Sequence, residues 1–325
     1  MRIPVIVAAK NEEASLGACL DALQAAVNHA RGRGFECVVT VVADDCSDGT
    51  EEVARGRGVR VVRSSGGKVE AQRAGLAACA ELEAEAGFAV FADADVLLTP
   101  PTLAALAETL LARPGVRVAC PPRRPLPPVR SGWLAWALHV YNYERGFSSQ
   151  RTWFNGKCFA IRRWNVPTRA EVARRVARLP DDNFYDYAAG MRIDDIYLSR
   201  RIVAEDGPEA LVETQEGCLI YRAPESLAGM YRYYRRMRME VERVSALFPE
   251  FNWAHERYGE READLLASAP LLRRSAYWLF HAALAVCMTG YRVERWYYRN
   301  LARSRCPAWP PIVETKGSLA EDGGG

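Results

Sequence analysis

The feature that most constrains the fold of this chain is a repeated alternation of short apolar segments with longer helical patterns. Five runs rich in β-branched and other apolar residues lie at 3–9, 38–43, 59–62, 88–92 and 116–120. A helical pattern begins at Asn11 after the first run, and a helix-compatible stretch that ends at Ala86 follows the third. Buried strands that alternate with helices predict a mainly parallel sheet with helices on both faces, and hence the α/β class.

Acidic residues follow two of these predicted strands at the point where each strand ends. Asp44 and Asp45 come directly after the second run, and Asp93 and Asp95 come directly after the fourth. Ligands of open α/β sheets bind beyond the carboxyl ends of the strands. The sequence therefore predicts a ligand site at this edge of the sheet.

Asp93 and Asp95 are separated by one residue and can converge on one hard cation, Mg²⁺ or Mn²⁺, which could hold a diphosphate. Two solvated turn aspartates are the simpler explanation, and the position after a buried strand favours a site. Asp44 and Asp45 can accept a hydrogen bond from the imide N–H of a pyrimidine or from a ribose hydroxyl. Alternatively, they merely form an acidic turn.

A second acidic pair, Asp194 and Asp195, opens a predicted helix over 194–205. Asp194 can cap this helix, while Asp195 can face a cleft as a general base. Alternatively, both carboxylates simply favour the positive end of the helix dipole.

Five motifs, taken together and in this order, resemble those of family 2 glycosyltransferases. They are residues 5–13 (VIVAAKNEE), 42–50 (VADDCSDGT), 67–76 (GKVEAQRAGL), Asp93-Ala94-Asp95 and Asp194-Asp195. The resemblance implies a GT-A fold, with a Rossmann-like, mainly parallel sheet, and a helical C-terminal extension. It also implies a nucleotide-diphosphate sugar as donor, most often a UDP-sugar, with Mn²⁺ or Mg²⁺ as cofactor.

The same resemblance assigns roles to individual residues. Asp195 becomes the general base, with Asp194 as the alternative because the usual pair in the family is Glu-Asp. Metal binding falls to Asp95 and Asp93, and acceptor binding to Asn155, Gly156 and Lys157. The donor is expected to contact Ala8, Lys10, Glu12, Asp44, Asp45, Lys68, Asp93, Asp95, Arg235 and Arg236. The two arginines can equally belong to a solvated basic helix face.

The implied domain organisation is a catalytic domain over 1–222, with a donor half at 1–128 and an acceptor half at 129–222. A proline-rich connector at 121–128 separates the halves. A helical region follows at 223–307, and a loose tail at 308–325.

The implied activity is non-processive, inverting transfer of a hexosyl or N-acetylhexosaminyl group, because the Gln-x-x-Arg-Trp motif of processive members is absent. The acceptor is left open among a small molecule, a glycan and a lipid-linked compound. A retaining GT-A enzyme and a catalytically silent nucleotide-sugar binder are the alternatives.

Three other classes of protein fit the sequence less well. A nucleotidyltransferase or a dehydrogenase needs a glycine-rich loop after the first strand, and residues 8–13 contain no glycine. The net charge of +3 is too small to indicate nucleic-acid binding.

Residues 275–291 contain no Asp, Glu, Lys or Arg and lie between Arg274 and Arg292. The segment falls short of the roughly 20 residues that span a bilayer, so a core helix and an interfacial helix are the main interpretations, and a marginal bilayer span is the third. Nine cysteines without a Cys-x-x-Cys pair, and no signal-peptide pattern, predict a cytoplasmic protein. An interfacial helix would place it at the inner face of the membrane.

Overall fold

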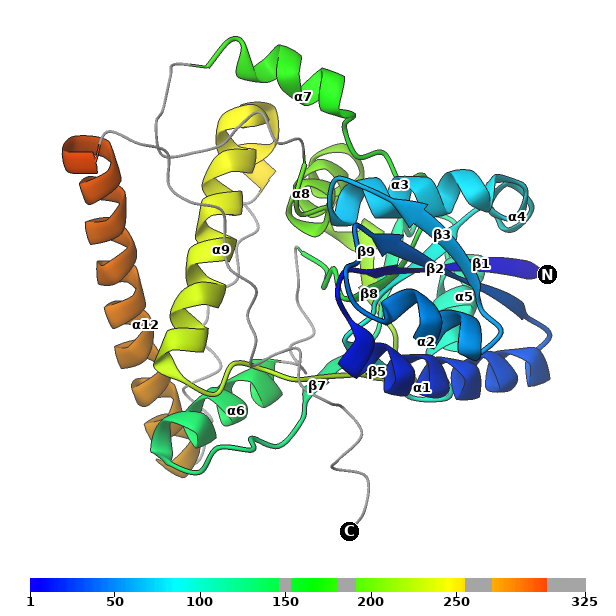
Figure 1. Ribbon diagram of the computed structural model, residues 1–325, viewed down its shortest axis with the longest axis horizontal. Coiled ribbons are helices and arrows are strands. Elements are labelled where there is room, and N and C mark those ends of the chain that lie inside the picture. The colour runs from blue at the N-terminus through cyan, green and yellow to red at the C-terminus, as the bar shows by residue number, and fades with distance from the viewer. Residues whose placement is uncertain (146–152, 180–190, 255–270, 303–325) are drawn as a thin grey trace.

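The structure is a computed structural model that describes residues 1–145, 153–179, 191–254 and 271–302. Figure 1 shows a sheet with helices on both faces, and two long helices beside it. The main sheet of the described residues has the strand order β3-β2-β1-β4-β8-β6-β9. These strands are β1 (Arg2–Ala9), β2 (Glu36–Asp44), β3 (Arg60–Ser64), β4 (Ala89–Asp93), β6 (Val118–Cys120), β8 (Cys158–Ile161) and β9 (Leu211–Glu213).

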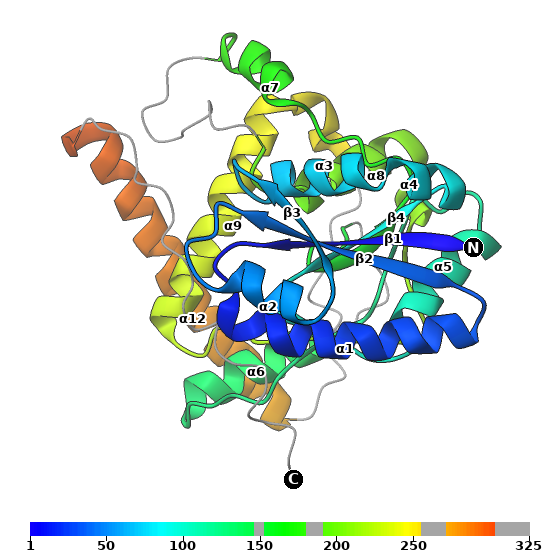
Figure 2. The same cartoon turned by 45° about the vertical axis from the view of Figure 1, so that its right-hand side comes forward.

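The helices that surround this sheet connect its strands. They are α1 (Glu13–Gly32), α2 (Thr50–Gly56), α3 (Lys68–Ala78), α4 (Ala80–Ala86), α5 (Thr102–Ala112), α7 (Arg169–Val176), α8 (Asp195–Asp206) and the 3₁₀ turn η2 (Pro208–Ala210). Side chains alternate between the two faces of a strand. Accordingly, Val5 and Val7 of β1 pack in the core with α1 and α5, whereas Ile6 packs in the core with α3 and α8. Figure 2 shows α1 and α3 on opposite sides of the sheet. The predicted α/β architecture is therefore confirmed.

One strand of the main sheet runs against its neighbours. β1 is parallel to β2 and β4, but β8 lies between β4 and β6 and is antiparallel to both. Ala92 of β4 pairs with Cys158 of β8. Because β8 is reversed, residues 155–157, which precede it, reach the edge at which β4 ends.

A second, smaller sheet has the order β5-β10-β7. Its strands are β5 (Val96–Leu98), β7 (Arg123–Pro125) and β10 (Leu219–Tyr221). β7 lies inside the segment 121–128, which the sequence indicated to be only a connector. It pairs with β10 at the edge of this sheet, where proline is tolerated.

The predicted helical extension is present and packs with an earlier helix. Its helices are α9 (Leu227–Leu247), the 3₁₀ turn η3 (Pro249–Phe251), α12 (Leu271–Tyr297) and the π-helical turn η4 (Tyr298–Ala302), and the earlier helix is α6 (Trp133–Arg145). Both views show α9 and α12 side by side. Tyr141 of α6 stacks on Phe280 of α12, with ring centroids 3.4 Å apart.

α12 is amphipathic, and its two faces have different surroundings. The buried side includes Tyr277 and Tyr291, whereas Trp278 is 72% exposed, Val286 57% and Trp296 57%. The segment 275–291 thus packs against the protein on one face and leaves apolar side chains exposed on the other. Within the described ranges, no helix combines the length and apolar character needed to cross a bilayer. The predicted tail at 308–325 lies outside the described residues.

Candidate functional site

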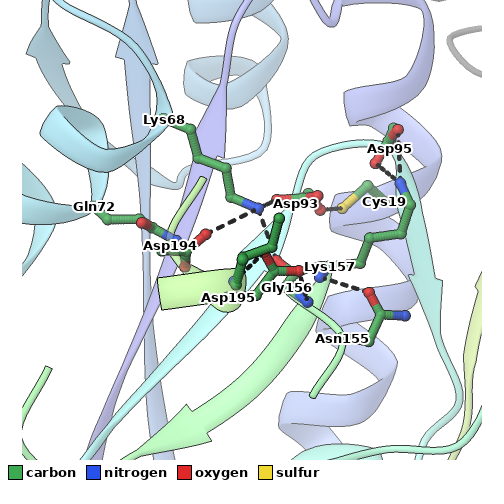
Figure 3. A network of polar contacts seen from close by, with 11 residues as sticks. Cys19, Lys68, Gln72, Asp93, Asp95, Asn155, Gly156, Lys157, Asp194 and Asp195 are labelled. Carbon is green, nitrogen blue, oxygen red and sulfur yellow. Dashed lines mark hydrogen bonds and ion pairs between the residues drawn. The ribbon is translucent and has the colours of Figure 1, made fainter. Parts of the chain in front are cut away.

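Four of the predicted acidic residues and the loop at 155–157 meet at the carboxyl end of β4, as Figure 3 shows for Asp93, Asp95, Asp194 and Asp195. Asp93 is the last residue of β4, Asp95 directly precedes β5, and Asp195 is the first residue of α8. The backbone N–H of Asp93 donates to the carbonyl of Lys157 at 2.7 Å, which ties the loop to the strand end.

The loop at 155–157 connects the two groups of aspartates. Lys157 Nζ lies 3.0 and 3.1 Å from Oδ1 and Oδ2 of Asp95. The preceding residue, Gly156, donates its backbone N–H to Asp195 Oδ2 at 3.0 Å. A Cβ at Gly156 would lie 2.7 Å from the same oxygen, so a larger residue would displace the Asp195 side chain. Two consecutive residues therefore contact the predicted metal ligand and the predicted base.

Lys68, the first residue of α3, lies at the centre of this network. Its Nζ donates to the carbonyl of Gly156 at 2.7 Å and pairs with Asp93 Oδ1 at 2.6 Å. Asp194 Oδ1 is 3.9 Å away. Burial lowers the pKa of Lys68, but the Asp93 and Asp194 carboxylates outweigh it and raise the pKa above its usual value. Lys68 therefore stays charged.

The adjacent residues Asp194 and Asp195 differ in exposure. Asp194 is 0% exposed, whereas Asp195 is half-buried. Gln72 donates from Nε2 to Asp194 Oδ2 at 2.8 Å, and Asp194 Oδ1 has no hydrogen-bond partner among the described residues. Asp194 occupies the predicted N-cap position, but its side chain makes no capping hydrogen bond.

Gln72 is a site residue that sequence reasoning missed. It lies four residues after Lys68 on α3. Residues at this spacing share one face of a helix, so the assignment of Lys68 could have led to it.

The carboxyl group of Asp195 has the character of a base. Burial raises its pKa to about 6, and the neighbouring Asp194 adds to the rise. The charge of Lys68 and the backbone N–H groups of Gly156 and Ile196 lower this pKa and offset part of the rise. Ile196 donates to Oδ1 at 2.8 Å. A carboxylate with this pKa is deprotonated at neutral pH and is more basic than an ordinary aspartate.

Asp44 and Asp45, at the end of β2, have different surroundings. Asp44 is buried and accepts the backbone N–H of Gly67 at 3.1 and 3.0 Å, and Lys10 Nζ at 3.4 Å. Gly67 has a φ of +96°, a conformation that favours glycine. Asp44 thus fixes the chain where α3 begins, while the side chain of Asp45 is 55% exposed.

The remaining predicted donor-binding residues lie on β1, directly before α1 and on α9. Ala8 pairs with Asp93 in the sheet and is therefore next to the site. Glu12 is buried and accepts from Ser15 Oγ at 2.7 Å. Arg235 is buried and paired with Glu294 of α12, with Nε 2.8 Å from Oε2, so it does not belong to a solvated face. Arg236 is half-buried on α9. Their roles in donor binding stay predictions.

Several solved structures are distantly similar to the chain. Glucosyl-3-phosphoglycerate synthase from Mycobacterium tuberculosis, in complex with Mn²⁺, UDP-glucose and phosphoglyceric acid, is 19% identical with a TM-score of 0.44, over 77% of this chain and 79% of that chain. The same enzyme with Mg²⁺ and UDP gives the same four values. A structure described only as a mycobacterial protein is 20% identical with a TM-score of 0.46, over 80% of this chain and 76% of that chain. No curated protein matches the sequence.

A family model, described as glycosyl transferase family 2, matches residues 5–174. The matched region contains β1, Lys68, Asp93, Asp95 and the loop at 155–157, and it ends before α8. It spans more than half of the sequence. The chain therefore belongs to glycosyl transferase family 2.

Proposed function

We propose that this protein is a non-processive, metal-dependent glycosyltransferase that moves a hexosyl or N-acetylhexosaminyl group from a UDP-sugar to an acceptor hydroxyl, with inversion. Family membership supports sugar transfer from a nucleotide donor. The observation that carries the proposal is the loop at 155–157, which contacts Asp95 through Lys157 and Asp195 through Gly156. Groups suited to the leaving diphosphate and to the attacking hydroxyl therefore lie in one site.

The residues at this site fit a divalent cation that binds together with the donor. Asp93 and Asp95 supply hard oxygen ligands, and Mg²⁺ commonly binds one or two carboxylates plus substrate phosphates. Within the part of the chain that the structure describes, no group of three or more His, Cys, Asp or Glu could hold a metal by itself. Diphosphate oxygens would complete the ligand set. When bound, Mn²⁺ or Mg²⁺ would offset the negative charge that develops on the departing nucleotide.

Asp195 is the proposed base because it is half-buried, whereas Asp194 is enclosed by the protein. The backbone N–H groups of Gly156 and Ile196 hold the two oxygens of Asp195 in place. As the acceptor oxygen attacks the anomeric carbon, its proton passes to the Asp195 carboxylate. Asp194 contributes by raising the pKa of this group.

Asn155 supports a substrate contact on the same loop. The Asn155 side chain is buried, and Oδ1 accepts from the backbone N–H of Lys157 at 3.0 Å. Its Nδ2 is buried with no hydrogen-bond partner among the described residues. A buried N–H donor of this kind is costly to leave unpaired, and a substrate oxygen would satisfy it.

A screen of nucleotides and nucleotide sugars tests the proposed function. UDP and at least one UDP-sugar are expected to raise the Tm when Mn²⁺ is present, because a ligand that binds only the folded state stabilises it. Incubation with an acceptor panel should then release UDP, and NMR of the product's anomeric proton should show inversion. Binding without any turnover would indicate a silent binder, and retained configuration a retaining enzyme. If no nucleotide diphosphate shifts the Tm, the proposal is wrong.

We also propose that the exposed face of α12 contacts an anionic membrane surface, which would place the protein at the cytoplasmic face. Trp278 and Trp296 lie on this face near its two ends, with Val286 between them. Arg292 is exposed near the C-terminal end of α12 and Arg299 on the η4 turn that follows, and Arg273 and Arg274 are exposed at the N-terminal end. Tryptophan at the headgroup boundary and arginine toward anionic lipid are the features of an interfacial helix.

Vesicle sedimentation tests this surface. The wild-type protein should pellet at low salt with vesicles that contain phosphatidylglycerol, but not with phosphatidylcholine alone. Replacing both Trp278 and Trp296 by Gln should weaken binding at least about tenfold, since burial of one large apolar side chain contributes about 1.5–3 kcal/mol. Trp253→Gln is the matched control, because Trp253 is 44% exposed and lies outside α12. Wild-type protein that ignores anionic vesicles would refute the proposal.

A further inference from the structure

The two aspartates predicted to bind the metal are each paired with a lysine. Lys157 Nζ contacts both carboxylate oxygens of Asp95, and Lys68 Nζ contacts Asp93 Oδ1 at 2.6 Å. These four side chains are between 16% and 25% exposed. Figure 3 shows both ammonium groups in the network of aspartates. Each predicted metal ligand therefore already has a positively charged partner before any ligand enters.

This pairing opposes the binding of a metal ion by itself. A cation at Asp95 needs the carboxylate oxygens that Lys157 already contacts, and it would sit close to two ammonium groups of like charge. Repulsion between like charges is strong where water is partly excluded.

A nucleoside diphosphate changes this balance because it brings several negative charges. Its phosphate oxygens can accept from Lys157 and can also bind the cation, so that Asp95 is released to the metal. The backbone of Lys157 is fixed by its N–H to Asn155 Oδ1 at 3.0 Å and by its carbonyl to Asp93 N at 2.7 Å. The side chain can therefore move without moving the loop. Lys68 is held additionally by the carbonyl of Gly156 and is better placed to stay.

We propose that Lys157 makes metal binding depend on the nucleotide: the divalent cation and the nucleoside diphosphate bind together, as the Lys157 ammonium moves from Asp95 to the diphosphate. This inference rests on the proposed function. Lys157 is then a diphosphate-binding residue of the donor site, which differs from its predicted place in the acceptor site.

Titration calorimetry with Mn²⁺ and UDP tests the proposal on the full chain. Mn²⁺ should bind the wild-type protein at least about tenfold more tightly with saturating UDP than without it. By linkage, UDP should bind tighter with Mn²⁺ than with EDTA by the same factor. This measurement requires no variant.

Lys157→Met should tighten Mn²⁺ binding to the nucleotide-free protein about tenfold and reduce the coupling, whereas Lys157→Arg, which keeps the charge, should retain the coupling. Arg63→Met is the matched control, because it removes a positive charge from an exposed pair with Glu51. Equal Mn²⁺ affinity with and without UDP, or unchanged Mn²⁺ affinity in Lys157→Met, would overturn the proposal. UDP that binds independently of Mn²⁺ defeats only this inference, whereas failure of UDP to bind under any condition defeats the proposed function.

Discussion

Asp195→Asn is expected to lower the turnover rate by about 10²–10⁴-fold, the range that follows loss of a general base. Asparagine keeps the size of the side chain at the start of α8 but cannot take a proton. Its one amide oxygen can keep only one of the backbone hydrogen bonds from Gly156 and Ile196, so a modest fall in Tm is also expected. Turnover by UDP release, together with UDP affinity by calorimetry, separates these effects. UDP affinity should stay near the wild-type value.

Asp194→Asn is the matched control for this change. It removes a buried carboxylate that contacts Gln72, and it should leave most of the activity. If Asp194→Asn loses activity while Asp195→Asn keeps it, Asp194 is the base. If both variants stay active, base catalysis by this pair is refuted.

The pH profile gives a second readout of the same prediction. Activity of the wild type should fall as the pH drops below about 6, because the base is then protonated. In Asp194→Asn this fall should occur at a lower pH, since the negative charge that raises the pKa of Asp195 is gone.

Asp95→Ala is expected to abolish the effect of Mn²⁺ on UDP binding and to lower turnover by about 10²–10³-fold, the size of losing one group that stabilises developing charge. In EDTA the variant should bind UDP at least as well as the wild type, because Lys157 no longer has Asp95 as its partner. Calorimetry with UDP in Mn²⁺ and in EDTA measures both effects.

The matched control for Asp95→Ala is Asp21→Ala, which removes an exposed aspartate of α1 that pairs with Arg57. It should behave as wild type in both buffers. If Asp95→Ala and the wild type show the same gain in UDP affinity from Mn²⁺, Asp95 is not a metal ligand.

The α/β class and the acidic residues of the candidate site could be predicted from local patterns in the sequence, whereas Lys68 and the loop at 155–157 were implied only by the resemblance to family 2 glycosyltransferases. The run at 88–92 is apolar and is followed at once by Asp93 and Asp95, so both the strand and the acidic end can be read from neighbouring residues. The same holds for Asp195, which begins a periodic helical segment. The choice between Asp194 and Asp195 could not be made this way. It depends on burial, which only the packed structure provides.

What the sequence did not reveal were contacts between distant residues. Lys157 meets Asp95 across 62 positions because β8 is antiparallel to β4. A short apolar run such as 158–161 carries no signal of its direction. The partner of Arg235 could not be predicted either. Several arginines lie close together in this segment, and nothing in the sequence indicates that Arg235 is the one that pairs with Glu294, 59 positions later.

The reversal of β8 has a consequence for how the site responds to destabilising changes. β8 is a central strand, hydrogen-bonded on one side to β4 and on the other to β6, and its four residues are all buried. Amide protons of such strands exchange with solvent through cooperative opening of the whole unit, rather than through local fraying. The loop at 155–157 is attached directly to this strand. The loop therefore keeps its geometry in every molecule in which the sheet is folded. A packing defect far away in the sheet would lower the fraction of folded molecules, and hence the amount of active enzyme. It would leave the chemistry of each folded molecule unchanged.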